Sequence, residues 1–164
     1  MVVRMKGEAI MHRRIFALIL GLLIPLLCLA QQPIVGTYKI VSYVIEIDGQ
    51  PREIFGKSPR GYAIITPTRI MFVVSAESRK FGTSVEERAA LWDSMISYTG
   101  PYRVEGDKLI TSVDASWNEN WNGTQQTRVW EAQGNRLTLT SLPAPYARDP
   151  SKIIVARLVW ERVE

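Results

Sequence analysis

Apolar and polar residues alternate along most of the chain after residue 33, a pattern typical of β-strands that face a core on one side. The first alternating stretch covers residues 34–48 and ends at Asp48-Gly49, a pair typical of tight turns. Both predicted faces carry apolar or aromatic side chains, so we expect neither to be fully exposed to water. One face holds Tyr38, Ile40 and Val44, and the other holds Val41, Tyr43, Ile45 and Ile47.

Further strand-like stretches follow, and short turns separate them. Residues 61–66 and 69–76 flank a Thr-Pro-Thr corner, residues 101–116 contain a turn at Gly106, and residues 127–141 contain one at Gly134. Because closure removes the unpaired edges of an open sheet, these stretches predict an all-β fold, an antiparallel up-and-down barrel of about eight strands. In the last stretch, residues 151–163, one face is expected to hold Ile154, Ala156, Leu158 and Trp160.

One stretch departs from the alternation and follows helical spacing. Ser84 followed by Glu87 fits a capping box, in which the two side chains satisfy free backbone N–H groups at a helix start. Ala89, Trp92 and Ile96 then recur at helical spacing, until Gly100-Pro101 ends the pattern. We predict one amphipathic helix over about residues 85–98.

The chain begins with a basic segment that contains Arg13 and Arg14 and continues in an apolar run over residues 15–30. A charged start, an apolar middle and a small final residue predict a signal peptide over residues 1–30 and one mature domain over residues 31–164. The alternative, a permanent membrane anchor, would need about 20 apolar residues. We therefore expect a periplasmic or secreted protein, which contacts the membrane only if this segment stays uncleaved.

Removal of residues 1–30 changes the chemistry of what remains. Sixteen basic and fifteen acidic residues are left, a net charge of +1, so a nucleic-acid surface is not indicated. His12 and Cys28 are the only histidine and cysteine, and both are removed. A Ser-His-Asp triad, a thiol nucleophile and a His/Cys zinc site are then excluded. We expect neither a metal nor a cofactor.

Several blocks of residues 34–162 also resemble one known family, in the same order along the chain. They are GTYKIVSY, SPRGYAIITP, WDSMISYTGPYRVEGDKL, NENWNGTQQTR and ARLVWER. These blocks resemble the bacterial lipocalin-like domain proteins, which are related to the calycins. The resemblance implies a barrel closed at one end by a first-strand aromatic residue, here Tyr38 instead of tryptophan, beneath Arg157 or Arg162. The predicted helix departs from the family pattern, because it precedes the later strands.

The stretch ASWNENWNGTQQTRVW, residues 115–130, holds the candidate ligand platform. Trp117 and Trp121 lie among asparagines beside an Asn-Gly turn, so we expect both at the barrel mouth, where an aromatic face can stack on a ligand. We expect the other three tryptophans, Trp92, Trp130 and Trp160, to be wall or core. The remaining candidates for ligand contact are Tyr62, Tyr98, Tyr102 and Arg128.

Three functions are compatible with this sequence. The first is an exported barrel that holds a small, largely apolar molecule without covalent chemistry. The second is an isomerase or cyclase, in which a barrel carboxylate or tyrosine moves a proton, with Asp114, Glu119 and Tyr98 as candidates. The third is a structural or interaction protein of the cell envelope, which an exposed apolar patch outside the barrel would support.

Overall fold

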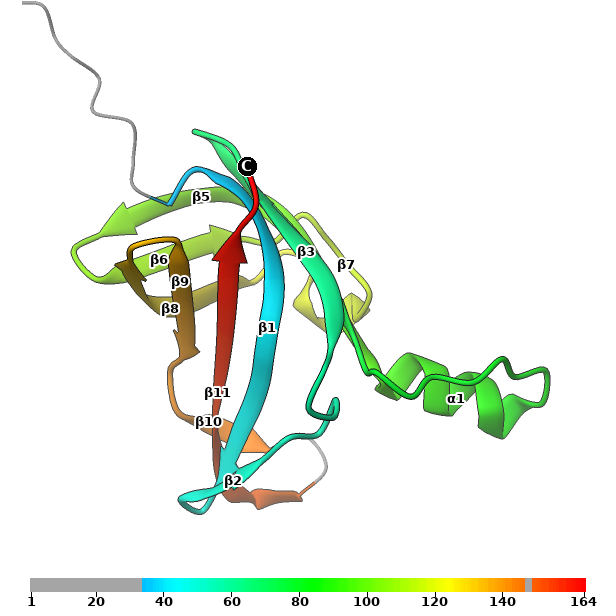
Figure 1. Ribbon diagram of the computed structural model, residues 1–164. Helices are drawn as coiled ribbons and strands as arrows, with labels where there is room; N and C mark the ends of the chain where they lie inside the picture. The colour runs from blue at the N-terminus through cyan, green and yellow to red at the C-terminus, as the bar shows by residue number, and fades with distance from the viewer. Residues whose placement is uncertain (1–33, 147–148) are drawn as a thin grey trace, which may run out of the picture. The chain divides into compact units, whose positions relative to one another are not determined.

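The computed structural model describes residues 34–146 and 149–164, so the predicted signal peptide lies outside the described residues. Eight antiparallel strands pair in chain order, and the last pairs with the first, which closes a barrel (Figure 1). The predicted up-and-down barrel of about eight strands is therefore confirmed. Its strands are β1 (Gly36–Ile47), β3 (Arg60–Ile65), β4 (Arg69–Ser75), β5 (Met95–Glu105), β6 (Lys108–Ser112), β8 (Gln125–Gln133), β9 (Arg136–Ser141) and β11 (Asp149–Arg162).

Short additional elements pair with the barrel strands or connect them, and some of them lie at one end of the barrel. β2 pairs with β1, β7 with β5 and β10 with β11, each over two or three residues. A 3₁₀ turn, η1, follows β7, and α1 lies between β4 and β5. Their bounds are β2 (Gln50–Arg52), β7 (Ala115–Ser116), η1 (Glu119–Trp121), β10 (Ala144–Tyr146) and α1 (Val85–Asp93).

A β-bulge in β1 corrects the predicted faces of that strand. The pairing of β1 with β11 shifts between Ile40 and Ser42, so Val41 is an extra residue on the β1 side. Such a residue changes which side chains point inward. Before the bulge Tyr38 and Ile40 are buried, and after it Tyr43 and Ile45 are buried. The prediction that these pairs lie on opposite faces is wrong, because a strict alternation cannot anticipate the extra residue.

The helix begins as predicted and ends early. Ser84 accepts from the Glu87 backbone N–H, and the Glu87 side chain accepts from the Ser84 N–H, which completes the capping box. α1 ends at Asp93, so its predicted continuation to residue 98 is wrong. From Met95 the chain pairs with β4. This pairing satisfies the backbone N–H and C=O groups that would otherwise form hydrogen bonds within the helix. No residue of α1 is buried, so the predicted amphipathic packing is wrong too.

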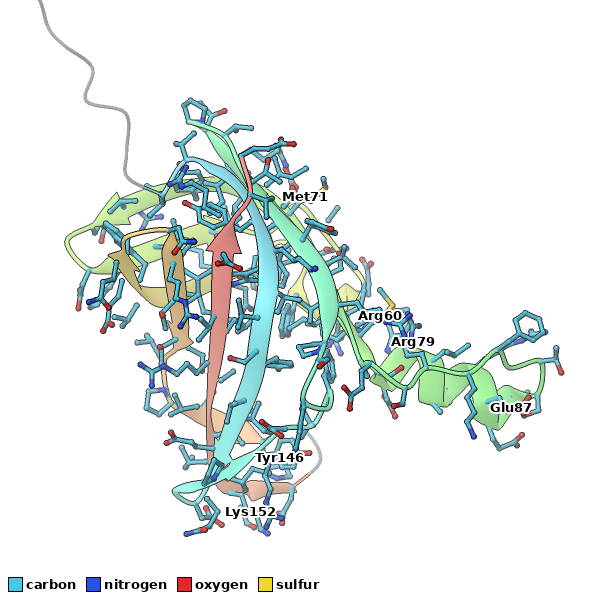
Figure 2. All side chains as sticks on the ribbon, in the orientation of Figure 1. Arg60, Met71, Arg79, Glu87, Tyr146 and Lys152 are labelled. Atoms are coloured by element: carbon cyan, nitrogen blue, oxygen red, sulfur yellow. The ribbon has the colours of Figure 1, made fainter. Side chains whose placement is uncertain are left out.

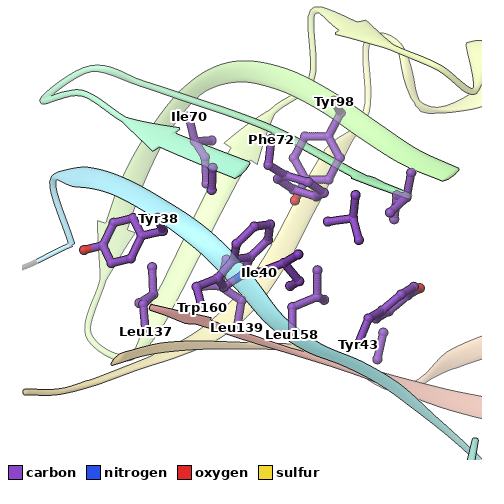
Figure 3. Packing of buried hydrophobic residues seen from close by; sticks show 14 of the residues in the cluster. Tyr38, Ile40, Tyr43, Ile70, Phe72, Tyr98, Leu137, Leu139, Leu158 and Trp160 are labelled. Atoms are coloured by element: carbon purple, nitrogen blue, oxygen red, sulfur yellow. The ribbon is translucent and has the colours of Figure 1, made fainter. Parts of the chain in front are cut away.

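The barrel interior is filled from one end to the middle by large side chains. Figure 3 shows Tyr38 and Tyr43 at opposite ends of this cluster, with Ile40 and Trp160 between them. Trp160 is fully buried and packs edge-on against Phe72, with ring centroids 5.7 Å apart. The predicted grouping of Ala156, Leu158 and Trp160 on one face of β11 is confirmed, and this face is the inward one, since all three side chains are buried.

The other two tryptophans predicted as wall or core differ from Trp160. Trp130 is partly buried against the core, and its Nε1–H donates to the Gly106 carbonyl over 3.3 Å. Trp92 is 51% exposed, so its assignment to the core is wrong. It lies in α1, on an arm that leaves the barrel between β4 and β5 (Figure 1).

The end of the barrel near Tyr38 is closed by Arg162. The Arg162 guanidinium carbon lies 4.9 Å from the Tyr38 ring centroid, and Nη2 donates to Tyr38 Oη over 2.6 Å. Tyr38 Oη in turn donates to the Ile34 carbonyl over 3.0 Å. Gly36 has φ 155°, and a side chain there would overlap the guanidinium, so this position requires glycine. Of the two arginines implied by the resemblance, Arg162 takes the structural part.

Candidate functional site

A cavity of about 400 Å³ opens at the other end of the barrel, beyond Tyr43. β1, β5, β8, β9 and β11 supply its wall, and the loop before β3, the segment after β7 and β10 supply its margin. Figure 2 shows Tyr146, one of the lining residues, at the end of the barrel that carries β2 and β10. The volume lies within the range of about 300–1,000 Å³ that is usual for small-molecule pockets.

Aromatic and aliphatic side chains form most of the cavity wall. Tyr43 and Phe55 are both buried and meet edge to face, with ring centroids 4.8 Å apart. Ile96, Ala156 and Leu158 add apolar surface deeper in the barrel. Such a wall favours an apolar guest, because burial of apolar surface is worth about 25 cal/mol per Å².

Trp117 and Trp121 both line this cavity. Their rings are perpendicular, with centroids 4.9 Å apart, and Trp121 also packs edge-on against Tyr98. The local sequence fixes this arrangement. The Asn118 side chain accepts from the Asn120 N–H, and the Asn118 carbonyl accepts from the Trp121 N–H, which folds the segment into η1. The turn brings the two rings together.

Among residues 34–146 and 149–164, Arg128 is the one charged residue that is buried. It lies on β8 between Leu109 of β6 and Ser141 of β9, and its side chain is only 8% exposed. Nη1 donates to the Thr127 carbonyl over 3.1 Å and Nη2 to Gln126 Oε1 over 3.5 Å. Arg128 also lines the cavity, so the structure brings together the predicted Trp117 and Trp121 pair and the separately predicted Arg128.

Tyr98 lies in the core behind Trp121 and does not line the cavity. Burial raises the pKa of Tyr98, and the charge of Arg128 and a hydrogen bond with Thr111 offset part of the rise. Burial likewise raises the pKa of Tyr43, again opposed by Arg128. Both hydroxyls are therefore protonated at neutral pH, and the guanidinium is near enough to act on both.

Two other predicted ligand contacts lie elsewhere. Tyr62 is 51% exposed on the outside of β3, because its neighbours Ala63 and Ile65 take the inward positions. The Tyr102 hydroxyl donates to the Thr66 carbonyl over 2.9 Å at the corner between β3 and β4, outside the cavity lining. Neither side chain contributes to the cavity, so this geometry does not support their predicted role.

The two candidate carboxylates are also outside the cavity lining. Asp114 forms an exposed bidentate pair with Arg69, with distances of 2.9 and 2.7 Å, and this pair lowers the pKa of the Asp114 carboxyl. Glu119 lies in η1 and accepts from the Asn122 side chain over 2.8 Å. Both act in turns and on the surface of the barrel.

Sequence reasoning missed most of the lining residues, among them the large apolar and aromatic side chains of Tyr43, Phe55, Ile96 and Tyr146. Tyr43 was grouped on the face opposite Tyr38 because the sequence does not show the bulge in β1. Ile96 was assigned to the helix, which ends at Asp93. Phe55 lies in a loop, although a large aromatic between the charged and glycine residues of EIFGKS is a signal of an anchored loop. Tyr146 comes from β10, which is too short to predict.

Within the two described ranges, no group of three or more His, Cys, Asp or Glu side chains is placed to hold a metal ion. The same ranges contain no helix whose length and hydropathy would let it cross a bilayer.

Comparison with known proteins identifies the family of this fold. Curated proteins give no match to the chain. A family model described as a lipocalin-like domain matches residues 35–163, which is most of the chain and every strand of the closed barrel. The match agrees with the aromatic and arginine pair that closes one end of the barrel. The chain therefore belongs to the lipocalin-like domain family.

Proposed function

We propose that this protein binds a small, largely apolar molecule in the cavity at the open end of the barrel. The observation that carries the proposal is the cavity itself, about 400 Å³ inside a closed barrel and lined mainly by aromatic and aliphatic side chains. Trp117 and Trp121 supply ring faces and edges at its margin, and Arg128 and Gln126 supply a few polar groups. Predominantly apolar walls with few polar groups are typical of pockets that bind small molecules.

The position of the cavity supports binding by a rigid host. Its wall is made by strands that are paired on both sides, and its far end is closed by Tyr38 and Arg162. A preformed pocket loses little conformational entropy when a guest enters, so more of the contact energy appears as affinity. Family membership is consistent with a binding protein.

A neutral fluorescent probe tests this proposal. Phenyl naphthylamine fluoresces in apolar surroundings, and its entry should also change the emission of Trp117 and Trp121. Replacement of Ala156 in the cavity wall by phenylalanine should fill part of the cavity and lower the affinity for the probe by tenfold or more. The matched control is Ala132→Phe, at an exposed position of β8. Equal probe binding by the two variants, or none by the wild type, would contradict the proposal.

We also propose that the protein is exported. The support is the order of features at the start of the sequence, with Arg13 and Arg14 before an apolar run that ends at Ala30. Cleavage there leaves Gln31 as the first residue. Cell fractionation followed by N-terminal sequencing checks this, and an intact N-terminus in the cytosolic fraction would refute export.

A second candidate function has one observation in its favour. Apolar side chains gather on the outside of neighbouring strands, where Tyr62 pairs in register with Val73 and Ile64 with Met71. All four are exposed, and Figure 2 shows Met71 on the outer side of the barrel. Such a face supports an interaction role. If it joins copies of this chain, sedimentation velocity should detect a dimer that Met71→Lys dissolves, and a monomer at all concentrations argues against that.

The isomerase or cyclase alternative lacks comparable support. It requires a carboxylate or a tyrosine that can exchange a proton with a guest. Asp114 and Glu119 lie outside the cavity lining, and Tyr98 is covered by the core and by Trp121.

A further inference from the structure

Arg128 carries a charge that the described residues do not neutralise. No carboxylate oxygen of residues 34–146 or 149–164 lies within 4.0 Å of its guanidinium nitrogens. A guanidinium has five N–H donors, and the two hydrogen bonds of Arg128 to Gln126 and Thr127 use two of them. The side chain is nevertheless more than nine-tenths buried and lines the cavity. Three donors and a full positive charge therefore lie at the cavity wall.

This arrangement is costly in an empty barrel. Arginine cannot lose its proton in a protein, so burial does not neutralise it. A buried charge is normally paired or hydrogen-bonded throughout, because the low dielectric of the interior penalises an isolated ion. An anion in the cavity would remove the penalty, and a planar carboxylate fits the two parallel N–H groups of a guanidinium.

The surroundings of Arg128 are those of an anion site. The hydroxyl of Tyr43 lies in the same lining and stays protonated, so it can donate. The buried Nε1–H of Trp117, which also lines the cavity, has no acceptor among the described residues. Asp93 is the one acidic residue in the described lining, at the end of α1, and it does not pair with Arg128. Arg128, Tyr43 and Trp117 thus place three different hydrogen-bond donors in the lining of one cavity.

We propose that the guest is an amphipathic acid, whose carboxylate pairs with Arg128 and whose apolar body lies against Tyr43, Trp117 and Trp121. This inference rests on the proposed function, since it assigns a chemical class to the guest of the same cavity. The depth of Arg128 sets the orientation. Because it lies on the barrel wall beside Leu109 and Ser141, the carboxylate enters first and the apolar body fills the mouth.

Two matched ligands separate the inference from the function on which it rests. Lauric acid and lauryl alcohol share the same alkyl chain and differ in the head group, and each is titrated against bound phenyl naphthylamine. The wild type should bind the acid at least tenfold more tightly than the alcohol. In Arg128→Met the affinity for lauric acid should fall by about 10- to 150-fold, the range expected for loss of a charged hydrogen-bonded partner. The affinity of the alcohol should change by less than about threefold.

Control variants keep the result interpretable. Arg157→Met removes an exposed arginine of β11 and should leave both affinities unchanged. Arg128→Lys retains the charge but loses the planar fork, so the acid should bind with intermediate affinity, and this variant serves if Arg128→Met does not fold. If the wild type binds the neutral probe but does not prefer the acid, the amphipathic acid is refuted and the proposed function stands. If it binds none of the three compounds, both fall.

Discussion

Replacement of Arg162 by methionine should destabilise the closed end of the barrel. Its guanidinium donates to the Val35 carbonyl and to Tyr38 Oη, and its carbon lies 4.9 Å from the Tyr38 ring centroid. A hydrogen bond with one charged partner contributes about 1.5–3 kcal/mol and a cation over a ring about 0.5–2 kcal/mol. Because these contacts share one side chain, they do not add. We expect the free energy of unfolding to fall by about 2–4 kcal/mol.

Urea unfolding followed by tryptophan emission measures this loss, since Trp160 is buried two residues away on the same strand. Arg157→Met is the matched control, because it removes an exposed arginine from β11 and should change stability by less than about 0.5 kcal/mol. Tyr38→Phe, made in the wild type and in Arg162→Met, completes a double-mutant cycle, in which we expect a coupling energy between the two residues of about 1 kcal/mol or more. Equal losses in Arg162→Met and Arg157→Met would refute the assignment of Arg162 as the residue that closes the barrel.

Three further predictions concern other parts of the barrel. Arg128→Met should raise the free energy of unfolding of the empty protein by about 1–2 kcal/mol, because it removes an unpaired buried charge, and a loss measured by urea denaturation would contradict this. Arg69 lowers the folded-state pKa of Asp114, so the pair stabilises above the unfolded pKa of about 4 and ceases to do so as pH falls through the lowered value. The stability difference between wild type and Asp114→Asn should accordingly shrink below about pH 4 in acid titrations, and a constant difference would be inconsistent with it. Gly36→Ala should cost at least about 2 kcal/mol more than Gly49→Ala in thermal unfolding, because a side chain at residue 36 meets both the Arg162 guanidinium and the Glu164 backbone carbonyl, whereas one at residue 49 meets open space. Equal costs would exclude that overlap.

How much of the fold can be predicted from the sequence depends on whether a strand's register follows from its own alternation or from its pairing with another strand. β11 keeps one alternation over its buried half, so the sequence alone predicts which of its residues share a face. β1 contains an extra residue at Val41, and only its pairing with β11 reveals the bulge. The helix shows the same division. Ser84 and Glu87 specify its start through a local capping box, whereas its end depends on β4, a partner that is distant in sequence.

The candidate site divides in a similar way. Trp117 and Trp121 are predictable because an aromatic residue among asparagines beside an Asn-Gly turn fits neither a core strand nor a solvated loop. Tyr62 has the same chemistry, but its neighbours Ala63 and Ile65 point inward and leave it outside. Whether an aromatic residue reaches a cavity therefore depends on strand phase, which a single sequence specifies only where its alternation is unbroken.

The two ends of the barrel use the same pair of residue types for different purposes. At the closed end, Arg162 meets the ring and hydroxyl of Tyr38 and a backbone carbonyl. At the open end, Arg128 acts on Tyr43 and keeps three of its donors directed to no acceptor of the described residues. A barrel that needed only closure would have no reason to bury a second cation beside an open cavity of about 400 Å³. The cost of that cation in the empty state is recovered only if a guest supplies the missing acceptor, so stability and binding should respond to Arg128 in opposite directions.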